Sequence, residues 1–301
     1  MKKSKTMIVV FLTPALLFFC TIFVYPILRT TLMSFFHVEN VTAGIGAWKF
    51  TGFSNYVTLL STSLFRISMW NLFRIWAAGG TVVMLVALLF AVILNSGIRF
   101  KKFFRAVIYL PNIVSAVALA TMWLQFVYNT RFGLLTSFFS WLGIDSLAAI
   151  QWTEAGAKFW SLLFAYCFGM VGYHMLIFSS GIEKIPVEYY EASAIDGASR
   201  ISQFRHVTMP LLKGVLRTNI TMWSITSVGF FVWSQLFSTV TADTQTITPM
   251  VYMYLQVFGT GNVITERNAG LGAAIGVLLG ICVVAVFVLT NRVVKDHELE
   301  Y

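Results

Sequence analysis

The segment EKIPVEYYEASAIDGASRISQFRHVTMP, residues 183–210, is the most informative stretch of this sequence. Pro186 suits the first turn of a helix, where its missing N–H costs no hydrogen bond, and Glu188 then lies near the positive end of that helix. Asp196 and Gly197 break the helix, because glycine adopts backbone conformations that a residue with a Cβ resists. The pattern predicts two short helices at a right-angle turn.

The second of these helices is expected to begin at Ser199, whose hydroxyl can cap it. Phe204 would lie on its inner face, and Pro210 would end it before the next apolar run. The alternative is an ordinary solvated loop, since charged segments are usually solvated. The residues by themselves leave both interpretations open.

Long apolar runs flank this segment and fill most of the chain. Of 301 residues, 58% are apolar and 11% are charged, whereas a soluble chain has about 25% charged residues. A helix needs roughly 20 apolar residues to cross a membrane. The composition therefore predicts an all-α polytopic membrane protein that forms a single domain over residues 1–301. Its six expected transmembrane helices are residues 7–28, 70–94, 103–127, 159–182, 215–240 and 269–290.

Lys and Arg are distributed unevenly between the two sides that these spans define. Fourteen of the 21 basic residues lie in the two terminal segments and in the connections after the second and fourth spans. An excess of basic residues marks the cytoplasmic side, so both termini and the 183–214 loop are expected in the cytoplasm. The net charge of +9 is then a topology signal, and no nucleic-acid partner is expected.

The N-terminal run could also be interpreted as a secretory signal or a lipoprotein leader. It is longer than a signal peptide's apolar region, lacks a small-residue cleavage site, and has the bulky Phe18 and Phe19 before Cys20. An uncleaved helix is favoured. The cysteines at 20, 167 and 282 have neither disulfide nor zinc spacing, so no metal is expected.

The connections are expected to be part of the membrane domain. Residues 30–69 are interpreted as a structured loop with aromatic side chains, and residues 136–142 as an interfacial helix. In the last span, Gly272, Gly276 and Gly280 form a small-residue stripe that allows close helix packing. The chain contains no G-x-x-x-x-G-K-[ST] motif, so it is not expected to hold ATP phosphates itself.

The residues of the 183–214 loop fall at offsets that resemble the EAA loop of bacterial ABC importer permeases. The matching positions are Glu191, Ala192, Asp196, Gly197, Ala198, Phe204 and Pro210. The resemblance implies that this loop is a coupling helix, which docks into a cleft on a cytoplasmic ATPase. Ser193 stands where a second alanine is typical, and Gly214 where a further proline is common.

Four further segments resemble the MalF-type sugar permease, the first of two unlike permease subunits. They are Tyr25-Pro26, residues 53–56 (FSNY), residues 109–111 (YLP) and residues 132–134 (FGL). This resemblance implies a MetI-like core of spans 2–6 plus an extra N-terminal helix. It also implies a transport subunit, not an enzyme, in the bacterial inner membrane.

The implied partners are a second homologous permease, two copies of an ABC ATPase that bind ATP and Mg²⁺, an extracytoplasmic solute-binding protein and membrane lipids. No cofactor is expected on this chain. The cargo would be a sugar or oligosaccharide; glycerol phosphate or another small solute is the alternative. A secondary transporter is a more distant alternative, since it would need intramembrane carboxylates.

Polar and aromatic side chains within the spans are the candidates for substrate contact, because aromatic faces cover sugar rings and amides or hydroxyls bind their hydroxyl groups. Trp223 and Ser227 share one helix face and are the first choice. Trp123 and Trp233 could instead anchor in the interface, and His174 could be an interhelical residue. The other candidates are Tyr166, Tyr173, Asn219, Gln235, Asn112 and Gln125.

Overall fold

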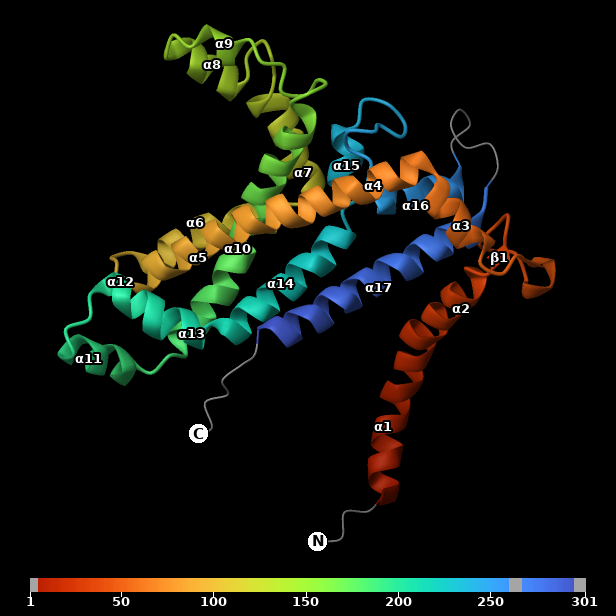
Figure 1. Cartoon of the computed structure of the whole chain (residues 1–301), viewed down its shortest axis with the longest axis horizontal. Coiled ribbons are helices and arrows are strands. Elements are labelled where there is room, and N and C mark those ends of the chain that lie inside the picture. Colours follow the sequence, from red (N-terminus) through yellow and green to blue (C-terminus); the bar gives the residue numbers. More distant parts are fainter. Residues whose placement is uncertain (1–4, 260–266, 295–301) are drawn as a thin grey trace. The chain divides into compact units, whose positions relative to one another are not determined.

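The structure, a computed structural model, describes residues 5–259 and 267–294, which are mostly helical (Figure 1). The predicted all-α class is confirmed, apart from one pair of two-residue strands. Internal contacts divide the chain into two compact units. The first unit consists of Met1–Arg66 and Tyr252–Ile281, and the second of Ile67–Val251 and Cys282–Tyr301. The single domain expected over residues 1–301 stays a prediction.

The first unit begins with a long apolar helix. Helix α1 (Lys5–Phe19), a π-helical segment (Cys20–Val24) and α2 (Tyr25–Met33) follow one another without a break. The stretch Met7–Met33 is long and apolar enough to span a membrane, and its most apolar window is wholly exposed. The first predicted span is therefore present and extends five residues beyond residue 28.

The connection after this helix is structured, as expected. Strand β1 (Phe36–His37) pairs antiparallel with β2 (Lys49–Phe50), and a 3₁₀ turn (Ile45–Ala47) and helix α3 (Ser54–Ser61) complete it. Asn55 is 4% exposed. Its Nδ2 donates to the carbonyl oxygens of Ser34 and Phe36, both at 2.9 Å. This amide thus satisfies one backbone acceptor at the end of α2 and one in β1.

The remaining helices are continuous in some places and broken in others. In chain order they are α4 (Ser63–Arg74), a π-helical turn (Ile75–Gly79), α5 (Gly80–Asn95), α6 (Lys101–Ile113), α7 (Ala116–Met122), a π-helical turn (Trp123–Val127), α8 (Leu134–Trp141), α9 (Asp145–Ala148), α10 (Lys158–Glu183), α11 (Val187–Ile195), α12 (Arg200–Gln203), a π-helical turn (Phe204–Thr208), α13 (Met209–Leu211), α14 (Lys213–Val228), α15 (Val232–Phe237), α16 (Pro249–Phe258) and α17 (Ala269–Val293).

Within the described ranges, four helices are long and apolar enough to cross a membrane: Met7–Met33, Ser63–Asn95, Lys158–Glu183 and Ala269–Val293. The predicted span at 103–127 is instead a pair of helices, α6 and α7, that meet at 97°. Ser115 caps α7 by accepting the Ala118 N–H at 3.3 Å, and Pro111 inside α6 removes one helical hydrogen bond. If this bent pair counts as one span, the described chain has five.

The predicted span at 215–240 is not one helix, so the expected number of six is not confirmed. Helix α14 ends at Val228, and α15 begins only at Val232. Gly229 disfavours helix continuation, and the Thr248 hydroxyl donates to the Phe230 carbonyl at 2.6 Å. That bond satisfies an acceptor which a continuous helix would have used. With 16 residues, α14 is about 24 Å long, shorter than the hydrocarbon core.

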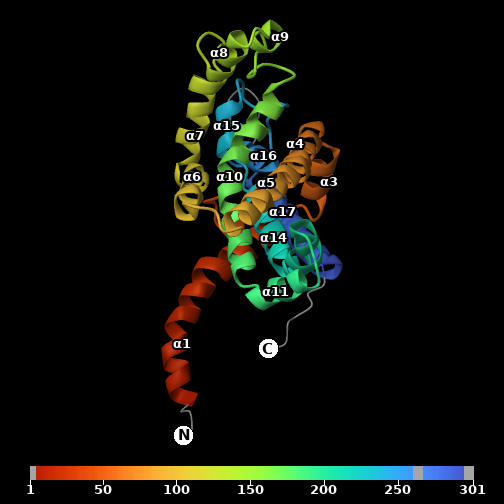
Figure 2. The same cartoon turned by 90° about the vertical axis from the view of Figure 1, so that its left-hand side faces the viewer.

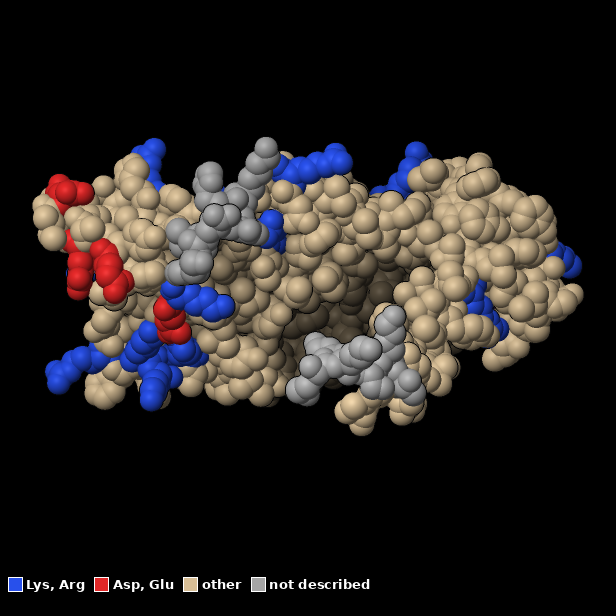
Figure 3. Space-filling view, turned by 90° about the horizontal axis from the view of Figure 1, so that it is seen from below, with Lys and Arg blue, Asp and Glu red and all other residues tan. Residues whose placement is uncertain are grey.

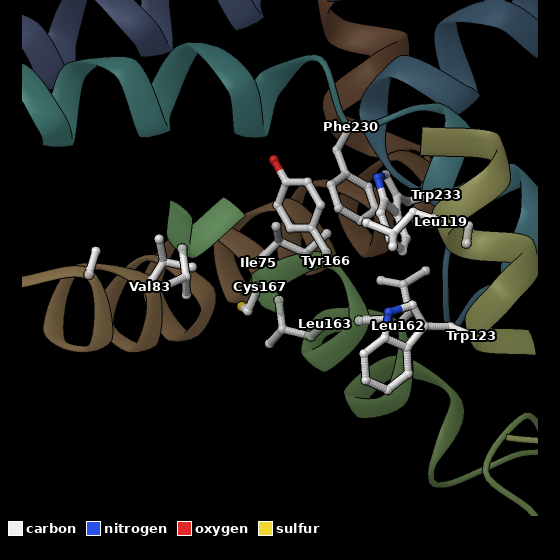
Figure 4. Close-up of a cluster of buried hydrophobic side chains, with 14 of the residues drawn as sticks. Ile75, Val83, Leu119, Trp123, Leu162, Leu163, Tyr166, Cys167, Phe230 and Trp233 are labelled. Atoms are coloured by element: carbon white, nitrogen blue, oxygen red, sulfur yellow. The ribbon is translucent and has the colours of Figure 1, made fainter. Parts of the chain in front are cut away.

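Helix α10 forms the centre of the second unit and packs on α5 and α6. Figure 4 shows Tyr166 facing Phe230 and Trp233, with ring centroids 4.7 and 5.8 Å apart. Glycine makes the helix contacts close: a Cβ on Gly172 would lie 2.4 Å from the Ile108 carbonyl oxygen. Because lipid is as apolar as a leucine side chain, such close packing and interhelical hydrogen bonds stabilise helix association in a membrane.

Candidate functional site

The 183–214 loop contains the two short helices predicted for it. Pro186 immediately precedes α11, and Asp196 follows it. Gly197 has φ +79°, the left-handed conformation common just after a helix. The N–H groups of Gly197 and Ala198 donate to the carbonyls of Ala194 and Ser193, at 3.0 and 2.9 Å. The helix therefore ends where the sequence indicated, for the expected reason.

Side-chain hydrogen bonds hold α11 against the segment that follows. The Ser199 hydroxyl accepts the Ser202 N–H, which confirms it as the cap of α12. Gln203 is 7% exposed, and its Nε2 donates to the Tyr190 carbonyl at 3.2 Å and to Ser193 Oγ at 3.1 Å. Ser193, the departure from the alanine of the EAA pattern, thus contributes to this brace.

One detail of the loop differs from the prediction. Pro210 does not end the second helix; it lies in the first turn of α13. The π-helical turn Phe204–Thr208 directly precedes it, and such a turn interrupts the regular i→i−4 bonding that a proline cannot complete. Phe204 begins the preceding π-helical turn and is half-buried. The chain is therefore helical almost continuously from α12 into α14.

The outer surface of the loop combines acidic and apolar side chains. Glu188, Glu191 and Asp196 are exposed, and Figure 3 shows acidic side chains gathered at the end where Figure 1 places α11. Ile195 and Ile201 are 87% and 80% exposed. These two isoleucines leave apolar side chains on the outer surface of the loop, available for contact with another protein. Ala192 is exposed and Ala198 half-buried.

A polar cluster at the end of α10 nearest this loop was not singled out from the sequence. Glu183 accepts hydrogen bonds from Lys101, at 2.9 Å, and from Arg105. Arg105 also donates to Ser179 Oγ at 2.7 Å, and Asn95 donates to the same oxygen at 2.9 Å. The cluster joins α5, α6 and α10. The one sequence feature that could have predicted this cluster is the placement of Arg105 and Glu183, which have opposite charges, at the cytoplasmic ends of two different predicted spans.

The predicted substrate residues of α14 lie inside the second unit. Trp223 is 2% exposed, and its Nε1 donates to the Trp76 carbonyl at 2.9 Å. That carbonyl belongs to a π-helical turn, in which the i→i−4 bonding is interrupted. A Cβ on Gly80 would lie 2.5 Å from the same indole nitrogen, so the ring packs directly on backbone. Substrate contact by Trp223 stays a prediction.

His174 and Asn219 form a buried pair. Both are 0% exposed, and His174 Nδ1 lies 2.7 Å from Asn219 Oδ1. This contact joins α10 to α14. His174 is therefore an interhelical residue, as one of the two interpretations of the sequence expected. In the described part of the chain, its Nε2 and the Ser227 hydroxyl have no hydrogen-bond partner.

The other candidates differ widely in exposure. Tyr173 and Asn112 are half-buried, whereas Gln235 and Gln125 are exposed. Tyr166, Trp123 and Trp233 are buried, at 6%, 7% and 7%. The structure therefore brings Tyr166, His174, Asn219, Trp223 and Trp233 into one core, and leaves both glutamines outside it.

The small-residue stripe of α17 lies in the first unit. A Cβ on Gly272 would come within 2.4 Å of Val257 in α16, and one on Gly276 would lie 4.0 Å from Met253. A Cβ on Gly280 would meet no atom of the described chain within 4 Å. Close packing at the first position is thus visible, while packing at the third stays a prediction.

Comparison with protein families adds the context for these features. Residues 83–296 match the family described as binding-protein-dependent transport system inner membrane component. The arabinooligosaccharides transport system permease protein AraP of Bacillus subtilis is 28% identical over 94% of this chain and 86% of its own length. The sn-glycerol-3-phosphate transport system permease protein UgpA of Shigella flexneri is 30% identical over 56% of this chain and 55% of its own.

Solved structures share the fold. A bacterial ABC transporter involved in the import of the acidic polysaccharide alginate matches with a TM-score of 0.79, covering 96% of this chain and 95% of that one, at 17% identity. A bacterial alginate ABC transporter in complex with alginate pentasaccharide-bound periplasmic protein matches with a TM-score of 0.78 at the same identity, over 96% of each chain.

Proposed function

Because the chain belongs to the family of binding-protein-dependent transport system inner membrane components, we propose that it is a permease subunit of an ATP-driven importer for a sugar or oligosaccharide. It is a multi-pass membrane protein, and the proposal places it in a bacterial inner membrane with both termini in the cytoplasm. The similarity to AraP, a permease for arabinooligosaccharides, supports the cargo assignment. It is a transport subunit, and ATP and Mg²⁺ would be bound by separate ATPase subunits.

The braced loop at α11–α12 is the observation that carries this proposal. Gln203 ties the two helices together, while Ile195 and Ile201 stay exposed. A rigid element with apolar side chains facing outward is suited to dock into a cleft on a cytoplasmic ATPase. The residues Glu191, Ala192, Asp196, Gly197, Ala198, Phe204 and Pro210 would form the docked segment.

Close packing offers a route from this loop to the spanning helices. A Cβ on Gly181 would lie 2.5 Å from Val215 and 3.0 Å from Leu212, so α10 and α14 are in direct contact beside the loop. Displacement of the loop by closing ATPases would therefore move both helices. In the proposed cycle, this movement turns the pathway toward the outside, where a solute-binding protein releases its cargo.

The remaining partners follow the same proposal. A second homologous permease would complete the pathway, and two ATPase copies would lie beneath the pair. Residues Trp223, Ser227, Tyr173, His174, Gln235 and Asn219 are proposed to contact the cargo. Glycerol phosphate remains the second candidate cargo, because UgpA is also a relative.

Substitution of the two exposed isoleucines tests the docking surface. We expect Ile195→Asp and Ile201→Asp to reduce co-purification of the ATPase and to abolish ATP-dependent uptake, because each places a charge in an apolar contact. Uptake would be measured with a labelled panel of mono- and oligosaccharides that includes sn-glycerol-3-phosphate. The panel identifies the cargo in the same experiment.

Ile45→Asp is the matched control, because Ile45 is 66% exposed in the connection after the first spanning helix. With the N-terminus in the cytoplasm, that connection would lie outside the cell. This variant should retain the ATPase and transport normally. Retention of the ATPase by both loop variants, with normal uptake, would contradict the proposed docking surface.

A further inference from the structure

A closed ring of hydrogen bonds ties the ends of three helices together. Glu183, the last residue of α10, accepts from Lys101 and Arg105 of α6. Arg105 also donates to Ser179 Oγ at 2.7 Å, and Asn95 of α5 donates to the same oxygen at 2.9 Å. Lys101 Nζ closes the ring by donating to Asn95 Oδ1 at 2.6 Å. Each of the five side chains is therefore bonded to two others in the ring.

The spacing of these residues fixes the register of α6 against α10. Lys101 and Arg105 are four residues apart on α6, as Ser179 and Glu183 are on α10, so each pair lies on one face of its helix. Sliding or rotation of either helix would break these bonds. Gly172 of α10 packs on the backbone of α6 further along the same contact. Attachment at two points makes α6 follow a movement of α10.

The ring lies next to the α11–α12 loop, and the link between them has little slack. Three residues separate Glu183 from Val187, where α11 begins. In this link the N–H groups of Lys184 and Ile185 donate to carbonyls of the last turn of α10, at 3.2 and 3.1 Å, and Ile185 is buried. A link held in this way leaves little freedom to absorb a displacement of α11, so the displacement reaches the end of α10.

One carboxylate holds both basic side chains of the ring. In the described chain, Glu183 is the only acidic residue that pairs with Lys101 or Arg105. Hydrogen bonds between ionised groups are stronger than those between neutral groups. Loss of the Glu183 carboxylate would therefore remove the two strongest bonds between α6 and α10, while these partly exposed basic side chains remain hydrated.

We propose that Glu183 is a positioning residue for transport, which passes the movement of the α11–α12 loop through the ring to α5 and α6. Gly181, in contact with Val215, connects the loop to α14. Because Gly181 and Glu183 are two residues apart, they lie about 200° apart around α10. The ring thus connects the helices on the face of α10 away from α14. This inference rests on the proposed function, since it assigns a role within the transport cycle.

The coupling of transport to ATP hydrolysis tests the inference, with the full-length chain and its co-expressed partner subunits in proteoliposomes. Both the ATPase rate and the uptake rate are measured, with the member of the labelled saccharide panel that the parent transporter takes up fastest. We expect Glu183→Ala to retain its ATPase subunits and to hydrolyse ATP. Uptake per ATP hydrolysed should fall about tenfold, the factor that corresponds to loss of one charge-assisted hydrogen bond.

Lys102→Gln is the matched control. Lys102 is an exposed neighbour on α6 and takes no part in the ring. Its substitution removes one positive charge from the same helix turn. The ratio of uptake to hydrolysis should stay at the parent value.

An exchange of charges separates a role in coupling from a purely structural one. Arg105→Glu by itself should uncouple transport, because it places a second carboxylate beside Glu183. Glu183→Arg combined with Arg105→Glu restores an opposite pair between α10 and α6. The double variant should recover at least half of the parent ratio of uptake to hydrolysis.

Spin labels measure the movement itself in a chain whose native cysteines are replaced by serine or alanine. Lys102→Cys reports on α6 and Val187→Cys on α11, and both parent side chains are exposed. With the ring intact, trapping the complex with ATP and vanadate should leave the distance between the labels unchanged. In Glu183→Ala the distance should change by at least about 2 Å, the scale of helix shifts.

A normal ratio of uptake to hydrolysis in Glu183→Ala would overturn the inference, as would a label distance that behaves alike in this variant and the parent. A parallel loss of uptake, hydrolysis and bound ATPase would overturn it too, because the ring would then only stabilise the fold. So would a charge exchange that performs no better than Arg105→Glu alone. Absence of ATP-dependent uptake in the parent transporter would instead contradict the proposed function, and the inference with it.

Discussion

Lys158 and Asp243 form a buried ion pair. Their side chains are 6% and 8% exposed, and Nζ lies 2.9 Å from Oδ2. Lys158 Nζ also donates to Thr239 Oγ1 at 3.0 Å, so the pair connects the start of α10 to the connection after α15. Neither residue has a local signal, because 85 positions separate them in the chain. The sequence therefore does not predict that these two residues form an ion pair.

Removal of one partner should be far more costly than removal of both. We expect Asp243→Ala to lower the free energy of unfolding by about 3–5 kcal/mol, because it leaves a buried charge without a partner. The double variant Lys158→Met with Asp243→Leu should lose much less. Denaturant unfolding of the purified protein measures both, with the exposed Asp145→Ala as control. Equal losses in the single and double variants would contradict this account.

Glycines in similar helices should respond in opposite ways to one added methyl group. At Gly80 a Cβ would lie 2.5 Å from Trp223 Nε1, whereas at Gly280 it would meet no atom of the described chain within 4 Å. Gly80→Ala should therefore cost about 1–3 kcal/mol through overpacking. Gly280→Ala should be neutral or stabilise by up to about 1 kcal/mol through helix propensity.

Thermal unfolding of the two variants measures the difference. If the Gly80→Ala variant were as stable as the parent protein, the Trp223 ring of α14 would have to be able to move away from α5. A Gly280→Ala variant that folds but no longer associates with its partner subunit would instead support packing of the stripe against another chain.

At the scale of elements, the helices are interrupted where polar groups can take over the backbone hydrogen bonds. The π-helical turn at Ile75–Gly79 coincides with the Trp76 carbonyl that accepts the Trp223 indole. The Trp76 indole in turn donates to Ser224 Oγ at 2.8 Å. These two bonds fasten the long Ser63–Asn95 helix to α14, so the interruption is specified by a tertiary contact.

The turn between α11 and α12 depends on one backbone conformation. Gly197 has φ +79°, which costs a residue with a Cβ about 1–2 kcal/mol. We expect Gly197→Val to disorder this turn and to reduce uptake severely, while the protein still inserts into the membrane. Initial uptake rates and the amount of ATPase retained on purification measure the effect.

Gly46→Val is the control, because Gly46 has no positive φ and a Cβ added to it would meet no atom of the described chain within 4 Å. It should transport at the normal rate. Normal coupling in Gly197→Val would mean that the position of α12 relative to α11 does not matter for docking.

At the scale of the second unit, the α8–α9 segment and the α11–α12 loop lie at opposite ends of α10. Figures 1 and 2 both show α8 and α9 near one end and α11 near the other. Helix α10 has 26 residues, which corresponds to about 39 Å. That length exceeds the hydrocarbon core, so the two regions should face opposite sides of the membrane.

Cysteine labelling tests this topology. The three free cysteines, Cys20, Cys167 and Cys282, are first replaced by serine or alanine. An impermeant maleimide should then label the Trp141→Cys variant in spheroplasts and the Ile195→Cys variant only in inside-out vesicles. Both parent side chains are exposed, at 79% and 87%. Labelling of both variants from the same side would contradict the proposed orientation.

The sequence by itself determined the class of protein, the first, second, fourth and sixth predicted spans, and the end of α11 at Asp196-Gly197. These features depend on local properties: the length of an apolar run, or the conformational freedom of one glycine. Residue spacing in the loop also identified the family, because unlike residues at fixed offsets rarely coincide by chance.

Only the tertiary structure decided where helices break and what the buried polar groups do. The break near Gly229 depends on Thr248, the Trp223 indole on a carbonyl of the Ile75–Gly79 turn, and Lys158 on Asp243. Each partner lies well outside the local helix. Hydropathy records which residues avoid water, but a buried hydrogen bond depends on which backbone or side chain the fold brings within about 3 Å.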